Sequence, residues 1–156
     1  MRAPAGAGIF LLGVVLEWAW GTYAAPGGVA PEVLVVLTVA VALRAGPAAG
    51  QCFAFSWGLF MDFLGPRLFG ANALALTLAA YGFGLARRQM DLSSPLSQAT
   101  VVGVVSAAHF AFVALTGLVF EGSALWPGLT SFVVVSLLNA IVAPLAFALV
   151  GQAVRP

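Results

Sequence analysis

The residues of this chain that could perform polar chemistry are few, and several lie within long apolar segments. Glu17 and Asp62 are carboxylates in such segments, and His109 is the only histidine among the 156 residues. Carboxylates and imidazoles can transfer protons or bind ligands. For His109 we favour a satisfied hydrogen bond between helices over a proton relay or a ligand contact. The intramembrane amide of Asn139 is typical of polar contacts that join helices.

The residue combinations that known catalytic sites require are missing. The sequence has no HExxH or GxSxG motif, and only one aspartate lies inside an apolar segment. These absences argue against an intramembrane protease. One histidine and one cysteine make a metal site difficult to assemble. We therefore expect no enzymatic activity, no catalytic residues, no metal and no cofactor.

The composition indicates an integral membrane protein. Hydrophobic residues make up 62% of the chain and charged residues 7%, whereas a soluble domain is about 25% charged. So few charges cannot cover a surface that faces water. The net charge of +1 offers no basic patch for nucleic acid. The expected surroundings are a lipid bilayer, with no nucleic-acid partner.

The lengths of the apolar runs predict transmembrane helices. Crossing about 30 Å of hydrocarbon takes about 20 helical residues. A transmembrane barrel would instead show shorter segments of alternating polarity. We expect one all-α domain over residues 1–156, with six transmembrane helices in a compact bundle. The spans are roughly 5–24, 29–44, 48–65, 69–86, 96–119 and 129–151.

The second span is the weakest, because its strictly apolar part covers only 33–43. A re-entrant segment is the alternative. With six spans and the N-terminus inside, five of the six arginines are cytoplasmic and only Arg67 is outside. The positive-inside rule therefore favours six spans with both termini cytoplasmic. Glu32 is then expected at the outer edge, and Pro31 in the first turn of the second helix.

Small residues and a carboxylate share one face of two expected helices. Such small residues mark close approach of helix backbones in lipid. A charged group in the bilayer costs about 2.5–3.5 kcal/mol, so both carboxylates should face protein or a water-filled cavity. Together with Asn72 they predict a polar cluster or small cavity that opens outward. The two faces contain Gly13, Glu17 and Gly21 in the first span, and Gly58, Asp62 and Gly65 in the third.

Each carboxylate has more than one interpretation. Asp62 is expected first to organise a helix end, by accepting hydrogen bonds from backbone N–H groups near Gly65 or by pairing with Arg67. A ligand or partner contact is its alternative role. For Glu17, a partner contact, an internal hydrogen bond and extension to the membrane surface are equally open.

The segment 58–74, GLFMDFLGPRLFGANAL, resembles the signature of the MreD family of rod-shape-determining membrane proteins. In that family a G-x-x-x-D helix end is followed by a glycine turn and a helix start rich in small residues. The resemblance is sharp over roughly 47–90, and elsewhere it rests on hydropathy. The residues that match the signature are Gly58, Asp62, Gly65, Gly70 and Leu74.

The resemblance implies a non-enzymatic scaffold of the cell-elongation (rod-shape, peptidoglycan-synthesis) machinery in the bacterial inner (cytoplasmic) membrane. It implies a hetero-oligomer with the single-pass protein MreC, and indirect contact with RodA, its transpeptidase and MreB. The family's fold is similar to the substrate-binding subunit of energy-coupling-factor transporters, so a solute-binding subunit for a vitamin-type transporter is the alternative. The candidate partner contacts are Glu17, Gly58, Asp62, Gly65, Arg67, Gly70 and Asn72.

Overall fold

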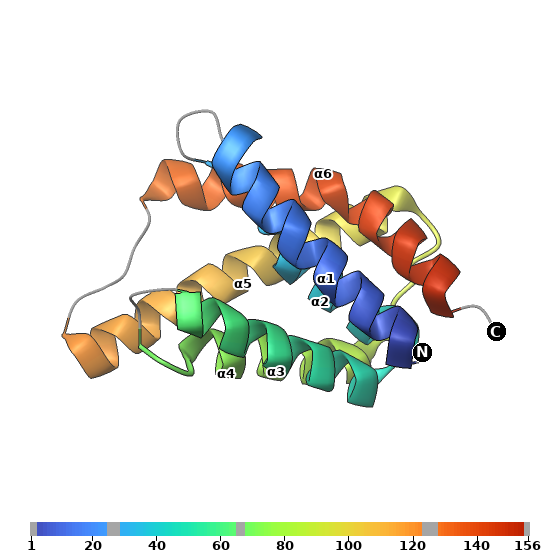
Figure 1. The fold of residues 1–156 in the computed structure, drawn as a ribbon, viewed down its shortest axis with the longest axis horizontal. Helices are drawn as coiled ribbons and strands as arrows, with labels where there is room; N and C mark the ends of the chain where they lie inside the picture. The colour runs from blue at the N-terminus through green and yellow to red at the C-terminus, as the bar shows by residue number, and fades with distance from the viewer. Residues whose placement is uncertain (1–2, 25–28, 65–67, 123–127, 155–156) are drawn as a thin grey trace.

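Six α-helices make up almost all of the computed structural model, which describes residues 3–24, 29–64, 68–122 and 128–154. No strand occurs among these residues, so the expected all-α class is confirmed. One helix lies in each of the six predicted spans (Figure 1). The helices are α1 (Ala3–Ala19), α2 (Val33–Ala45), α3 (Pro47–Leu64), α4 (Ala71–Ala86), α5 (Pro95–Glu121) and α6 (Leu129–Val154), and a short π-helix, η1 (Trp20–Ala24), continues α1.

Within the described ranges, three stretches of helix are long and apolar enough to cross a membrane: Ala5–Tyr23, Pro95–Glu121 and Leu129–Ala153. The apolar helices α2 and α4 are shorter, with 13 and 16 residues. At 1.5 Å per residue, α2 extends only about 20 Å, less than the hydrocarbon thickness of about 30 Å. The long apolar helices indicate a membrane protein by their length and composition.

The short helix α2 is the centre of the bundle. Every side chain from Val33 to Leu43 is buried, and α2 contacts each of the other five helices. A helix that is apolar on all sides is stable where other helices surround it. The run that suggested a re-entrant segment therefore forms the core. Glu32 is the N-cap of α2, so Pro31 precedes the helix and does not lie in its first turn as expected.

Helix α3 makes backbone contact with its neighbours through glycines. A Cβ atom on Gly58 would overlap the backbone of Ala73 in α4. A Cβ atom on Gly50 would lie 2.5 Å from the Cα atom of Ala42 in α2. Neither position leaves room for a side chain, so glycine is what allows these helices to meet. The predicted close approach on the Gly58 face is confirmed.

Helix α1 is held to the bundle through its N-terminal half. The ring of Phe10 lies 4.5 Å from that of Trp57, and it also meets the rings of Phe53 and Phe60 edge-on. Beyond Val14, most side chains of α1 and η1 are exposed. One aromatic cluster thus anchors the helix, and its C-terminal half packs loosely.

The described arginines of the loops and helix ends lie together at one end of the molecule. Arg44, in the last turn of α2, lies over the ring of Phe147 in α6, 5.8 Å from its centroid. The guanidinium of Arg87 lies beside Gly46, just after α2. The start of α1 and the end of α6 lie at this same end (Figure 1). Glu32 is the N-cap residue of α2, so it lies at the opposite end of that helix from Arg44.

Candidate functional site

The carboxylate of Asp62 caps the first turn of α4 from the neighbouring helix. Its Oδ2 atom accepts hydrogen bonds from the N–H groups of Gly70 (3.0 Å) and Ala73 (3.1 Å). Its Oδ1 atom accepts from the N–H (3.1 Å) and the side-chain amide (2.9 Å) of Asn72. The first N–H groups of a helix have no partners within it. Gly70, the N-cap of α4, has no side chain that could accept hydrogen bonds from these groups. Asp62 of α3 accepts them instead.

The role expected for Asp62 as a helix-end organiser is therefore present, with different partners. The expectation placed the bonded N–H groups near Gly65, whereas they belong to residues 70–73. A carboxylate at the end of one helix bonds best to unsatisfied donors, and those donors lie at the start of the next helix. Gly65 and the proposed ion-pair partner Arg67 lie outside the described residues.

Buried polar contacts continue from this cap across the bundle. The Oδ1 atom of Asn72 lies 3.2 Å from Nε2 of His109, and Nδ1 of the same ring lies 3.6 Å from Oε2 of Glu32. The main-chain N–H of Glu32 donates to Oδ1 of Asn139 at 2.7 Å. The amide of Asn139 donates to Oγ of Ser106 at 2.9 Å. This polar network (Asp62, Asn72, His109, Glu32, Asn139 and Ser106) connects α3, α4, α5 and α6 to the start of α2.

The predicted interhelical bonds of His109 and Asn139 are confirmed by these contacts. Glu32 is the member that the sequence interpretation missed, since it was expected at the outer edge. Its side chain is only 19% exposed and faces His109. The physical reason is the shortness of α2, whose first turn begins inside the bundle. A charged residue directly before a short, wholly apolar helix was the signal in the sequence.

The directions of the hydrogen bonds define which ring atoms of His109 face Asn72 and Glu32. The amide nitrogen of Asn72 donates to Asp62, so its oxygen faces His109, and Nε2 must carry a hydrogen to donate to it. Nδ1 then faces Oε2 of Glu32, and neither atom has a hydrogen-bond partner within the described chain.

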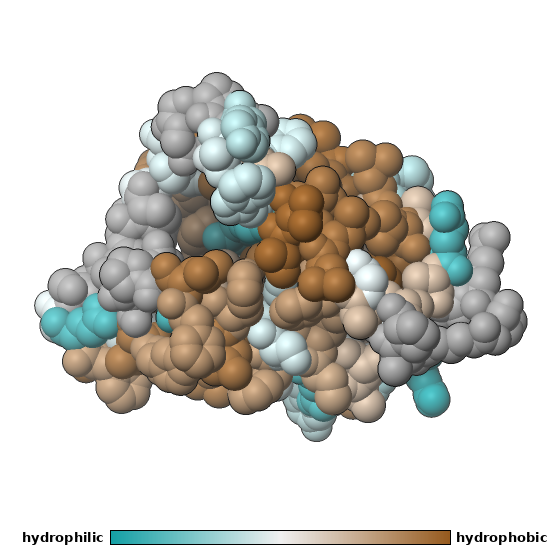
Figure 2. Space-filling model, viewed as in Figure 1, coloured by the Kyte–Doolittle hydropathy of each residue, from teal (hydrophilic) through white to brown (hydrophobic). Residues whose placement is uncertain are grey.

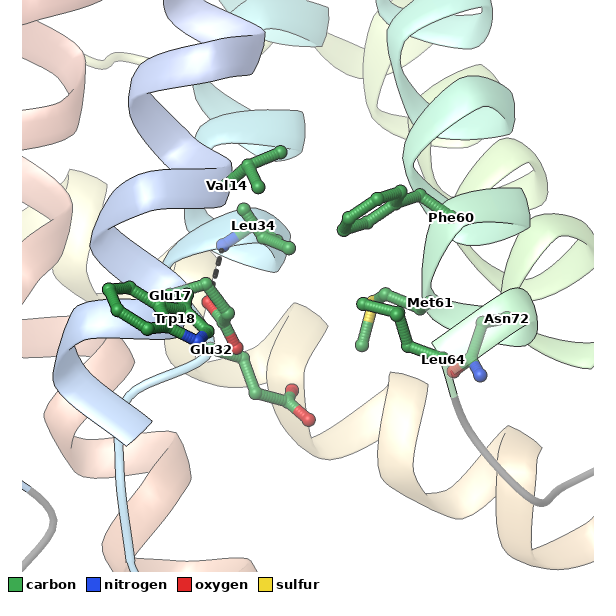
Figure 3. A pocket seen from close by; sticks show the side chains of 9 residues that line it. All are labelled: Val14, Glu17, Trp18, Glu32, Leu34, Phe60, Met61, Leu64 and Asn72. Carbon is green, nitrogen blue, oxygen red and sulfur yellow. Dashed lines mark hydrogen bonds between the residues drawn. The ribbon is translucent and has the colours of Figure 1, made fainter. Parts of the chain in front are cut away.

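A cavity of about 520 Å³ lies beside the network, between α1 and α3 (Figure 3). Glu17 and Glu32 lie on one side of it, and Asn72 lies on the other with the apolar side chains of α3 (Figure 3). Figure 2 shows this face hollowed, with hydrophilic surface inside the hollow and apolar surface below it and to its right. The lining residues are Val14, Glu17, Trp18, Glu32, Leu34, Phe60, Met61, Leu64 and Asn72.

The expected polar cavity thus contains Glu17 and Asn72, whereas Asp62 is engaged behind Asn72. Glu17 accepts a long hydrogen bond, 3.4 Å, from the N–H of Leu34. An internal hydrogen bond is one of its three interpretations, and its position at the cavity leaves a partner contact open. The α3 side chains of the cavity wall were not expected, because apolar residues on a membrane helix carry no sign of what they face.

The other candidate contact residues are used mainly within the chain. Gly58, Asp62 and Asn72 are buried, and Gly70 is half-buried. Their contacts hold α3 against α4, so they are positioned to shape this part of the bundle. No group of three metal-binding side chains occurs in the part of the chain that the structure describes. Comparison of the sequence and the structure with models of protein families, with curated proteins and with solved structures finds no match.

Proposed function

We propose that the chain is an MreD-like scaffold of the bacterial cell-elongation machinery that binds MreC in the inner membrane. The observation that carries the proposal is the joint between α3 and α4. Gly58 packs on Ala73, and Asp62 caps the helix that begins after Gly70. These residues belong to the signature that resembles MreD. Their contacts give a physical reason for its glycine, aspartate and small-residue helix start.

We also propose that all six helices cross the membrane, with both termini in the cytoplasm. In support, the start of α1 and the end of α6 lie at the same end of the molecule as Arg44 and Arg87, which suits a cytoplasmic side. The carboxylates of Glu17 and Glu32 lie at the other end of α2. We propose in addition that the six-helix bundle is arranged as in the substrate-binding subunit of energy-coupling-factor transporters.

The contact with MreC is assigned to the exposed side of α1 and η1. Trp18 and Tyr23 are exposed there and pack edge to face, with ring centroids 5.9 Å apart. Gly21 has nothing within 4 Å of the position that a Cβ atom would take. Helices associate in membranes where small residues let backbones approach. Gly58 already serves α4 in this way, whereas Gly21 is free to meet a second chain.

Co-purification with MreC tests this assignment. The chain and an affinity-tagged MreC are produced together, and the amount recovered with the tag is divided by the amount in the membrane. We expect recovery of the unchanged chain and a loss of about tenfold for Gly21→Leu, because a bulky side chain keeps the helices apart. Gly82→Leu is the matched control, since Gly82 in α4 is equally open. Failure to recover the unchanged chain, or equal recovery of both variants, would contradict the proposal.

The cavity favours one second candidate, a solute-binding subunit of a vitamin-type transporter. Its volume of about 520 Å³ suits a small ligand. Such subunits usually carry an Ala-x-x-x-Ala stripe on the first helix, and Gly13, Glu17 and Gly21 match it poorly. A vitamin-sized molecule retained through purification, detected by mass spectrometry after denaturation, would support this candidate over the scaffold.

A further inference from the structure

The cavity between α1 and α3 has an unbalanced charge. Glu17 and Glu32 both line it, and none of the described residues that line it is an arginine, lysine or histidine. Charges beside a largely apolar wall interact more strongly than they do in water. Two carboxylates facing one small volume therefore favour a positively charged occupant.

An independent feature behind the cavity wall also indicates a missing donor. The side chain of His109 is 3% exposed, and its Nδ1 atom points at Oε2 of Glu32 across 3.6 Å. Both atoms lack a hydrogen-bond partner in the described chain. The separation exceeds the 2.7–3.2 Å of an ordinary N–H···O bond. The Glu32 carboxylate thus has a buried oxygen without a donor on its His109 side. The same carboxylate lines the cavity, from which a donor can reach its other side.

The lining suits an organic cation better than a metal ion. Calcium takes six to eight oxygen ligands, and the described chain has no cluster of three metal-binding residues. An ammonium group has three N–H donors, which match the two carboxylates and the oxygen of Asn72 in number. The rest of the wall is apolar or aromatic and fits a hydrocarbon stem. These wall residues are Val14, Trp18, Leu34, Phe60, Met61 and Leu64.

We propose that the cavity binds a primary ammonium group carried on an apolar stem. Glu17 and Glu32 accept its hydrogen bonds, and Phe60, Met61 and Leu64 contact the stem. Two sources share this chemistry: a free alkylamine and the ethanolamine headgroup of a membrane lipid. The inference goes beyond the scaffold proposal and does not depend on it, because binding is measured on the chain alone, without MreC.

Native mass spectrometry of the full chain in detergent at neutral pH tests the proposal. The probes are n-hexylamine, n-hexanol and hexanoate, which have similar stems and differ in charge. We expect saturable binding of hexylamine alone. Glu17→Gln and Glu32→Gln should each weaken it about tenfold or more, the effect of losing a charge-assisted hydrogen bond. Glu121→Gln, at an exposed carboxylate that ends α5, should leave hexylamine binding unchanged.

Two further arms keep the test independent of misfolding. Met61→Trp fills the cavity without altering any charge, and we expect it to abolish hexylamine binding while the melting temperature is kept.

In the second arm, short-chain phosphatidylethanolamine is compared with the matching phosphatidylcholine. Preference for the former identifies the lipid headgroup as the source, and binding of hexylamine but of neither lipid identifies a free amine. Hexanol binding as tightly as hexylamine, or unchanged hexylamine binding in Glu17→Gln or Met61→Trp, would overturn the proposal.

Discussion

Two helical hairpins of this chain, α1–α2 and α3–α4, share one sequence pattern but differ in how closely their two helices pack. In each, a glycine and an acidic residue four positions later face the next helix. Asp62 accepts four hydrogen bonds at the start of α4, whereas Glu17 accepts one long bond, from Leu34, at the start of α2. The hairpin α3–α4 is closed, and α1–α2 is open beside the cavity.

The residue opposite each glycine explains the difference. Gly58 faces the backbone of Ala73, so α3 and α4 touch main chain to main chain. Gly13 faces the side chains of Leu34 and Leu37, which hold α1 further from α2. A carboxylate four residues along then reaches its donors easily in the first case and barely in the second. The spacing of small residues defines a helix face, and the facing residue decides whether that face closes.

The largest expected effect comes from separating the closed hairpin. In Gly58→Leu the new side chain must displace the backbone of α4, and we expect a loss of more than about 3 kcal/mol of stability. Thermal melting in detergent and the level of the chain in membranes measure it. Gly82→Leu, at an open position of α4, should melt close to the unchanged chain. Similar melting of the two variants would show that the α3–α4 contact is not close-packed.

Removing the cap is expected to be the next most damaging change. Asp62→Ala leaves the N–H groups of Asn72 and Ala73 buried without an acceptor, and we expect a loss of about 2–3 kcal/mol. Asp62→Asn keeps one acceptor oxygen and should lose less. Chemical denaturation in mixed micelles compares the variants. A loss in Asp62→Ala no greater than that in Asp62→Asn would contradict the capping role.

The polar network connects the two hairpins, because His109 lies between Asn72 of one and Glu32 of the other. His109→Ala should cost about 1–2 kcal/mol, since it removes one hydrogen bond and leaves the amide oxygen of Asn72 unpaired. His109→Ala and Glu32→Gln should also be non-additive, because the two side chains are in contact. Strict additivity in the same denaturation experiment would show that this contact contributes nothing.

The smallest effect is expected in the open hairpin. Glu17→Gln should change stability by less than about 1 kcal/mol, because it alters a single long hydrogen bond beside an open cavity. The contrast with Asp62→Asn, the equivalent change in the closed hairpin, is the informative quantity. Equal losses in melting temperature for the two variants would mean that the hairpins do not differ in the way described.

The apolar runs predicted where the helices lie, because uninterrupted hydrophobic sequence of this length has few other folded states. They did not show that α2 is the centre of the bundle, since an apolar helix has the same sequence pattern whether protein or lipid surrounds it. The importance of Asp62 was foreseen, but its partners depend on how α4 docks. Glu32 and the cavity wall at Met61 were missed, because their surroundings are set by contacts between distant parts of the chain.

Site-specific photocrosslinking in intact membranes tests most directly whether the open hairpin is the surface that contacts MreC. A photoreactive phenylalanine is placed at Trp18 on α1 or at Tyr81 on α4, two exposed aromatic positions. Helix α4 packs against α2, α3 and α5, so its exposed side serves as the control. A crosslink to MreC from position 18 and none from position 81 is the expected result. A crosslink from position 81 alone, or from neither position, would contradict the assignment.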